Sequence, residues 1–195
     1  MRTAEEATNL CHSCPKLCRS SSPVAEADHN EATTPWGKMS AMKLVDRGIL
    51  PFNRETASLA YKCLNCRASE SVCELENPVP ETLNHYRAKA FANGIAPPAV
   101  HDYAQRFQRF SNPFSEDLSE KLNRLFPREF KRPKGRIAYF PGCTEIHDSP
   151  ETIDKTLSLF RRSGVNLGLY PEPILCCGYP LHAAGDRENF RELAE

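Results

Sequence analysis

The chain has 195 residues, with 25 basic and 25 acidic side chains and 40% hydrophobic residues, a length that allows one domain or two small ones. Because the charges balance in both halves of the sequence, a general binder of nucleic acid or anionic membranes is excluded. No apolar run approaches the roughly 20 residues that span a bilayer, and the first residues lack the apolar stretch of a secretory signal, so we expect a cytoplasmic protein.

The first group of cysteines lies close to the N-terminus. The surrounding stretch is rich in Ser, Pro and Cys, which disfavour a long regular helix, so it predicts a loop that presents ligands. Its cysteines are Cys11, Cys14 and Cys18.

Two helices are predicted next. Thr34 is a favourable N-cap, and Pro35 a favourable first residue, for a helix that Gly48 ends. Trp36, the only tryptophan, is expected to lie in the core, and the alternative is that it lines a cluster and limits the access of solvent to it. Asn53 predicts the cap of a second, short helix, which leads into the second group of cysteines. These are Cys63, Cys66 and Cys73.

Three further helices are predicted before residue 127. On each of them apolar residues repeat at helical spacing, which gives the helix one apolar face. The apolar positions are Leu83, Tyr86 and Ala90 in the first, Val100, Tyr103, Ala104, Phe107 and Phe110 in the second, and Leu118, Leu122 and Leu125 in the third. The sequence therefore predicts a helical domain over residues 1–126.

The sequence changes character after this domain. Prolines and a glycine interrupt a basic stretch, which predicts a linker over residues 127–135. The remaining residues, 136–195, have the short apolar runs and intervening helix of an α/β domain.

This α/β part predicts a β-α-β unit. Ile137–Phe140 and Val165–Tyr170 are apolar runs typical of short buried strands, with a helix between them. Cys143 follows the first strand, and Cys176 and Cys177 follow the second. Because the carboxyl ends of parallel strands meet at one edge of a sheet, we expect these three cysteines to lie close together.

The cysteines carry the main functional signal. In a reducing compartment, clustered cysteines are more often metal ligands or redox groups than disulfide partners. A run of cysteines at short spacing presents three thiolates to one iron–sulfur cubane, and a distant fourth thiolate completes it. In two-cluster ferredoxins, the last cysteine of each run ligates the cluster of the other run.

This crossover divides the ligands of the two runs unequally. One set has four thiolates, and the other has two thiolates and two serine hydroxyls. The first set is Cys11, Cys14, Cys18 and Cys73, and the second is Cys63, Cys66, Ser22 and Ser69. Because a hydroxyl binds iron poorly unless it is deprotonated, the sequence predicts one well-formed 4Fe-4S cluster and a second site that is absent, labile or altered.

Two alternatives use the same residues. The pairs Cys11-x2-Cys14 and Cys63-x2-Cys66 together offer four thiolates for tetrahedral zinc, which would make the chain a zinc-stabilised interaction module without redox activity. That interpretation leaves one cysteine of each run without a role. The other alternative is a truncated product, whose lone β-α-β unit leaves its sheet edges uncovered.

Several motifs point to one family. They are Cys11-His-Ser-Cys14-Pro-Lys-Leu-Cys18, Thr34-Pro-Trp-Gly-Lys-Met, Cys63-Leu-Asn-Cys66, Pro141-Gly-Cys143 and Cys176-Cys177-Gly178-Tyr179-Pro180. The first three resemble the helical two-cluster ferredoxin domain of cytoplasmic iron–sulfur oxidoreductases, and the last two resemble the cysteine-rich CCG domain of the same proteins. Relatives include heterodisulfide reductase subunits and the iron–sulfur subunits of glycolate, lactate and glycerol-3-phosphate oxidation. The resemblance implies an α-helical ferredoxin domain followed by a partial α/β cysteine-rich domain.

The chain departs from this family in its CCG motif. It carries Cys143, Cys176 and Cys177 but reaches Glu195 before the further C-x2-C of a complete motif. We therefore expect the first part of a longer protein, or a partner that supplies the rest.

The resemblance also implies a function. It implies an electron-transfer subunit, or its amino-terminal fragment, without catalysis of its own, that relays electrons from a flavin-bearing dehydrogenase partner to a disulfide or quinone acceptor. Any association with a membrane would be peripheral and made through a partner.

Overall fold

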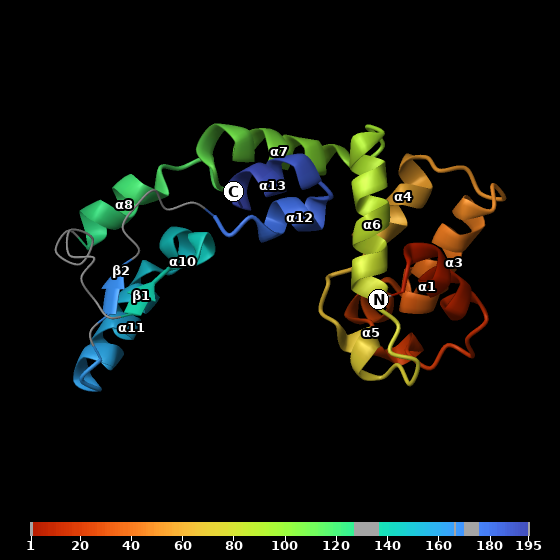
Figure 1. Cartoon of the computed structure of the whole chain (residues 1–195), viewed down its shortest axis with the longest axis horizontal. Coiled ribbons are helices and arrows are strands. Elements are labelled where there is room, and N and C mark those ends of the chain that lie inside the picture. The colour runs from red at the N-terminus through yellow and green to blue at the C-terminus, as the bar shows by residue number, and fades with distance from the viewer. Residues whose placement is uncertain (1, 127–136, 166, 170–175, 195) are drawn as a thin grey trace. The chain divides into compact units, whose positions relative to one another are not determined.

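The computed structural model describes residues 2–126, 137–165, 167–169 and 176–194 (Figure 1). The predicted linker over 127–135 lies outside these ranges. The predicted domain limits therefore remain predictions. No helix in the described ranges is long and apolar enough to cross a bilayer.

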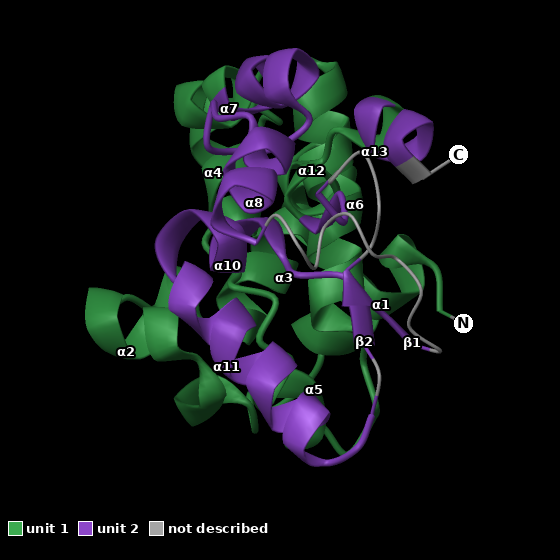
Figure 2. Cartoon of the chain, turned by 90° about the vertical axis from the view of Figure 1, so that its left-hand side faces the viewer, with its two compact units in different colours: residues 1–102, 180–188 green, residues 103–179, 189–195 purple. Residues whose placement is uncertain are grey.

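The chain divides into two compact units, which Figure 2 colours separately. Unit 1 comprises residues 1–102 and 180–188, and unit 2 comprises residues 103–179 and 189–195. A short stretch from the C-terminal part of the sequence thus packs with the N-terminal helices. This assignment of residues 180–188 depends on long-range contacts and has no local signal in the sequence.

Unit 1 is built from helices joined by loops. As predicted, no strand occurs in the described residues before 127. The longer helices contact one another around a common core in which Met39, Met42 and Leu83 are fully buried. The helices are α1 (Ala4–His12), α2 (Pro23–Asp28), α3 (Pro35–Asp46), α4 (Arg54–Tyr61), α5 (Ala68–Ser71) and α6 (Val79–Ala92), with single 3-10 turns at Arg19–Ser21 and Glu31–Thr33.

The predicted caps of α3 and α4 are confirmed. The Thr34 hydroxyl accepts a hydrogen bond from the amide of Gly37 at 2.9 Å, and the Asn53 side chain accepts one from the amide of Thr56 at 3.0 Å. Each bond satisfies one of the amides that the start of a helix leaves without a partner.

The prediction of a loop around the first cysteines is partly wrong. Cys11 lies in the last turn of α1, and only Cys14 and Cys18 lie in the loop that follows. A capping box between Thr3 and Glu6 starts this helix, with bonds of 2.8 and 3.2 Å. These two residues were the local signal for α1.

Unit 2 contains the predicted β-α-β unit. β1 (Ile137–Tyr139) and β2 (Leu167–Leu169) are parallel, with Ala138 opposite Gly168, and α11 (Pro150–Arg162) connects them. The described strands are shorter than predicted.

Further helices follow α6 along the chain, and all but the first residue of α12 (Tyr179–Ala184) belongs to unit 1. α7 (Pro98–Phe110) begins in unit 1 and ends in unit 2. Asp117 caps α8, its carboxylate accepting from the amide of Glu120 at 2.8 Å. The helices that complete the chain are α8 (Leu118–Leu125), α10 (Cys143–Asp148), α12 (Tyr179–Ala184) and α13 (Arg187–Ala194). Of these, α10 and α12 were not predicted.

Candidate metal centre

The structure brings together the four cysteines that the crossover assigns to one cluster. They line a single cavity of about 190 Å³, together with apolar side chains such as Leu17 and Val79. One of these cysteines comes from the last turn of α1, two from the loop after it, and one from the loop after α5. These are Cys11, Cys14, Cys18 and Cys73.

The electrostatics of this cavity suit a positively charged group. Burial, together with the nearby Cys18, Cys73 and Cys14, raises the pKa of the Cys11 thiol to about 12, although a hydrogen bond from Asn77 lowers it. Burial also raises the pKa of Cys18. Four thiolates are therefore costly to hold here without a cation, and iron or another metal would supply the missing positive charge. The donor set fits a 4Fe-4S cluster.

A hydrogen bond fixes one of these sulfur atoms. The side-chain amide of Asn77 donates to Cys11 Sγ at 2.9 Å and to the carbonyl of Ala7 at 2.9 Å. Asn77 itself is 1% exposed. A hydrogen bond to a metal-binding atom orients the ligand and tunes the metal centre that it holds.

Trp36 lines the same cavity and is only partly buried, which favours the predicted alternative of a side chain beside the cluster over a place in the core. The Lys16 ammonium lies 3.9 Å from the centre of its ring. The indole N–H is buried without a hydrogen-bond partner among the described residues. Its ring therefore forms part of the wall that separates the four thiols from water.

The second set of predicted ligands lines a different and much smaller cavity. Cys63, Cys66, Ser22 and Ser69 line a space of about 20 Å³, which is room for about one water molecule, and Ser69 also lines the larger cavity. The Ser22 hydroxyl already accepts a hydrogen bond from the amide of Ala25 at 3.3 Å, as the N-cap of α2. Two thiols and two hydroxyls around so small a space do not fit a second cubane.

Lys38 is a member of this second cavity that was not predicted from the sequence. The side chain projects from α3, is 3% exposed, and donates to the carbonyl of Lys62 at 3.4 Å. Burial lowers its pKa. A lysine within a helix has no local signal of burial, because such residues usually face solvent.

The zinc alternative requires Cys11 and Cys14 to meet Cys63 and Cys66. In the structure the two pairs line different cavities. Among the described residues, no three His, Cys, Asp or Glu side chains are arranged to hold a single metal ion.

The third group of cysteines lies in unit 2. Cys143 is the first residue of α10, and its Sγ lies 3.3 Å from that of Cys176, as the β-α-β topology predicted. Both side chains are buried, whereas Cys177 is exposed. The Cys176 thiol donates its hydrogen bond to Cys143, which lowers the pKa of Cys143 to about 6 and raises that of Cys176.

Comparison with known proteins identifies this part of the chain. Residues 137–195 match the family described as the cysteine-rich domain CCG. The resemblance to iron–sulfur oxidoreductase subunits with a CCG domain is confirmed.

A curated relative extends this similarity toward the helical part. Over 126 residues the chain is 25% identical to one of the subunits of the dihydromethanophenazine:CoB–CoM heterodisulfide reductase of Methanosarcina mazei. The match covers 64% of this chain and 31% of the relative, so the chain spans about a third of the relative's length. No solved structure matches the chain significantly.

Tyr103 lies beside the cysteines of the CCG domain although it precedes the matched residues. Burial raises its pKa, and the thiols of Cys176 and Cys143 raise it further. Its hydroxyl is buried and has no hydrogen-bond partner among the described residues. From the sequence, Tyr103 was expected only as one position on the apolar face of a helix, without a connection to the cysteines.

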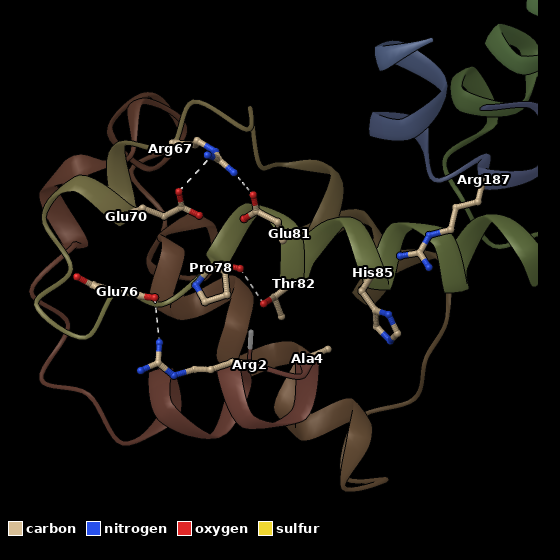
Figure 3. A pocket seen from close by; sticks show the side chains of 10 residues that line it. All are labelled: Arg2, Ala4, Arg67, Glu70, Glu76, Pro78, Glu81, Thr82, His85 and Arg187. Atoms are coloured by element: carbon tan, nitrogen blue, oxygen red, sulfur yellow. Dashed lines mark hydrogen bonds and ion pairs between the residues drawn. The ribbon is translucent and has the colours of Figure 1, made fainter. Parts of the chain in front are cut away.

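A larger cavity in unit 1 contains no cysteine. It measures about 540 Å³ and is lined by charged side chains from several segments. Figure 3 shows Arg67 between Glu70 and Glu81, and its guanidinium forms ion pairs with both. Because these opposite charges are paired, the electrostatic potential of the cavity is not dominated by either sign.

Proposed function

We propose that this chain is an electron-transfer subunit, or part of one, in an iron–sulfur oxidoreductase, and that it binds one 4Fe-4S cluster. The observation that carries the proposal is that four cysteines from two distant runs line one cavity. They are Cys11, Cys14, Cys18 and Cys73. When bound, such a cluster accepts and returns single electrons.

The contrast between the two cavities supports one cluster rather than two. The cavity with four thiols has about 190 Å³, and the cavity with two serines has about 20 Å³. The smaller one also contains the buried side chain of Lys38. Its size, its set of two thiols and two hydroxyls, and the Lys38 side chain all differ from what a cubane site requires.

The chain's own residues would set the properties of the bound cluster. Asn77 orients Cys11, while Trp36 and Leu17 keep water away from the sulfur atoms. Ligation by thiolates, hydrogen bonds to sulfur and limited exposure to solvent are the means by which proteins adjust reduction potentials.

The partners belong to the same proposal. The curated relative is a subunit of a heterodisulfide reductase, which supports a multi-subunit complex and a disulfide as the electron acceptor. A flavin-bearing dehydrogenase is the proposed electron donor, and a quinone is the other acceptor class. The proposed location is the cytoplasm, with any membrane contact made through a partner.

Metal analysis of protein purified without oxygen tests the proposal. We expect about four irons and four acid-labile sulfides per chain, with the brown absorbance of a cubane. Cys73→Ala should lose both, because it removes a ligand of the larger cavity. Cys66→Ala is the matched control and should keep them, since Cys66 lines the other cavity. About eight irons per chain, or zinc without sulfide, would contradict the proposal.

A further inference from the structure

Helix α3 buries two lysines in different surroundings. Lys38 and Lys43 are 3% and 5% exposed. The Lys43 ammonium lies 3.9 Å from the carboxylate of Glu5. Lys38 has no ion pair with a carboxylate in the described ranges, and its ammonium donates a hydrogen bond to the carbonyl of Lys62 at 3.4 Å. A buried charge without a carboxylate beside it is costly for a fold to keep, which points to a role for Lys38 beyond packing.

Thiols face the Lys38 ammonium from both cysteine runs. Lys38 lines the smaller cavity together with Cys63 and Cys66. Burial lowers the pKa of Lys38, whereas the charges of Cys63 and Cys66 raise it. The charge of Arg87 also lowers it, and that of Cys18, which lines the larger cavity, raises it. The ammonium therefore interacts with sulfur atoms of both cavities.

The two cavities share part of their wall. Ser69 and Val79 line both of them, and these side chains are 8% and 3% exposed. Trp36, two residues before Lys38 on α3, lines the larger cavity. Buried side chains thus separate the ammonium from the place of the proposed cluster, and charges interact more strongly across such a region than across solvent.

We propose that the buried Lys38 ammonium raises the reduction potential of the 4Fe-4S cluster in the larger cavity. Reduction adds one electron, and hence one negative charge, to the cluster and its four thiolates, with no bond formed or broken. A fixed positive charge nearby stabilises the reduced form more than the oxidised form. Lys38 acts through its electric field and is not a ligand.

This inference rests on the proposed function, because it requires the cluster, and it names a residue that sets the potential of that cluster. The iron content tests the proposed function, and the potential of the loaded chain tests the inference. The two can therefore fail separately.

A redox titration of the full chain, followed by electron paramagnetic resonance, tests the inference. The chain is purified without oxygen, and its iron and sulfide are measured before each titration. In Lys38→Met the ratio of reduced to oxidised cluster at a fixed potential should fall at least threefold, which is a drop in midpoint potential of about 28 mV at 59 mV per tenfold change. Lys38→Arg keeps the positive charge and should remain close to the wild type.

Lys43→Met is the matched control. It removes a buried lysine from the same helix, but one that is paired with Glu5 and lines neither cavity. Its midpoint potential should equal that of the wild type. Urea unfolding of Lys38→Met should show no loss of stability, because methionine keeps an apolar side chain of similar length and removes an ammonium whose burial is costly.

An unchanged potential in Lys38→Met, with about four irons bound, overturns the inference and leaves the proposed function intact. Equal shifts in Lys38→Met and Lys38→Arg, or in Lys38→Met and Lys43→Met, also overturn it, because a change of packing would then be the cause. If Lys38→Met binds no iron, the uncharged Lys38→Gln replaces it. Loss of iron in both would make Lys38 a requirement for assembly and overturn its role in the potential. A wild-type chain without iron overturns the proposed function and the inference together.

Discussion

The side chain of Asn77 donates a hydrogen bond to the sulfur of Cys11 at 2.9 Å, although the two residues are 66 positions apart in the sequence. The same amide also holds the carbonyl of Ala7. Asn77 thus connects the loop after Cys73 to the helix that presents Cys11.

Removal of this hydrogen bond should lower the reduction potential of the proposed cluster. A donor to a ligand sulfur stabilises the reduced, more negative state. Asn77→Leu keeps the volume but removes the donor, so we expect the midpoint potential to fall by roughly 20–60 mV, equivalent to a bond of about 0.5–1.5 kcal/mol in a one-electron step. A redox titration followed by electron paramagnetic resonance measures the shift.

Asn112 provides the control for this variant. It is 2% exposed, and its amide donates to the carbonyls of Phe110 and Glu116 at 2.8 Å in unit 2. Asn112→Leu should reduce stability to a similar extent without a change in potential. Equal potentials in the wild-type and Asn77→Leu chains would show that Asn77 does not act on the cluster.

Replacement of both serines in the smaller cavity should create a second cluster. In the double variant Ser22→Cys and Ser69→Cys, this cavity gains the two thiolates that the crossover pattern lacks. We expect iron and sulfide to rise from about four to about eight per chain. The lost cap of α2 should cost about 1 kcal/mol of stability.

A second double variant controls for the added cysteines. Ser20→Cys and Ser71→Cys introduces two thiols close by in the sequence but outside the residues that line the smaller cavity. Its iron content should equal that of the wild type. If the Ser22 and Ser69 variant also shows no increase, thiolate ligands alone are insufficient, and the buried Lys38 would be the remaining obstacle.

The grouping of the cysteines around one cavity could be predicted because it depends on spacing. The crossover pattern separated Cys73 from Cys63 and Cys66, and the structure places Cys73 in the cavity of the first run. The proximity of Cys143 and Cys176 followed in the same way from the β-α-β topology. In both cases, local signals were combined with a general rule of architecture.

The residues around these ligands could not be predicted, because their burial depends on tertiary packing. Lys38 has the local signal of a solvent-facing residue, yet it lines a cavity. For Trp36 the sequence offered both the core and the side of a cluster, and no local signal decides between them. Tyr103 has the local signal of one position in an apolar stripe. Only the packing of distant segments brings these side chains to the sulfur atoms.

Tyr61 should make the stability of unit 1 sensitive to alkaline pH. Its hydroxyl donates to the carbonyls of Arg87 at 3.1 Å and Ala184 at 2.9 Å. Burial raises the pKa of Tyr61 from 10.0 to about 12. Because the folded state binds this proton more tightly than the unfolded state, the associated stability is complete below pH 10.0 and is lost as the pH rises toward about 12.

Urea unfolding of the wild-type and Tyr61→Phe chains at several pH values tests this expectation. The variant lacks the titrating group and its hydrogen bond to these carbonyls, which should cost about 0.5–1.5 kcal/mol below pH 10.0. The difference between the two chains should shrink above that pH. Tyr179→Phe is the control, because the Tyr179 side chain is 52% exposed. A difference that stays constant up to pH 12 contradicts the assignment.

Gly185 marks the point where residues 180–188 touch α6. Its φ is +89°, and a β-carbon there would lie 2.5 Å from the carbonyl carbon and oxygen of Arg87. Arg87 also donates from Nη1 to the carbonyl of Ala183 at 2.8 Å. The backbone of α6 cannot easily move aside, because it is held by the hydrogen bonds of the helix.

Gly185→Ala should therefore destabilise the chain by more than its backbone conformation alone explains. Gly94 supplies the comparison: its φ is +68°, and no atom lies within 4 Å of a β-carbon built there. We expect Gly94→Ala to cost about 1 kcal/mol from backbone strain, and Gly185→Ala to cost several kcal/mol because it also forces the segment away from α6. Urea unfolding measures both losses. Similar losses in the two variants would mean that residues 180–188 do not pack against α6, and would remove the contact that assigns them to unit 1.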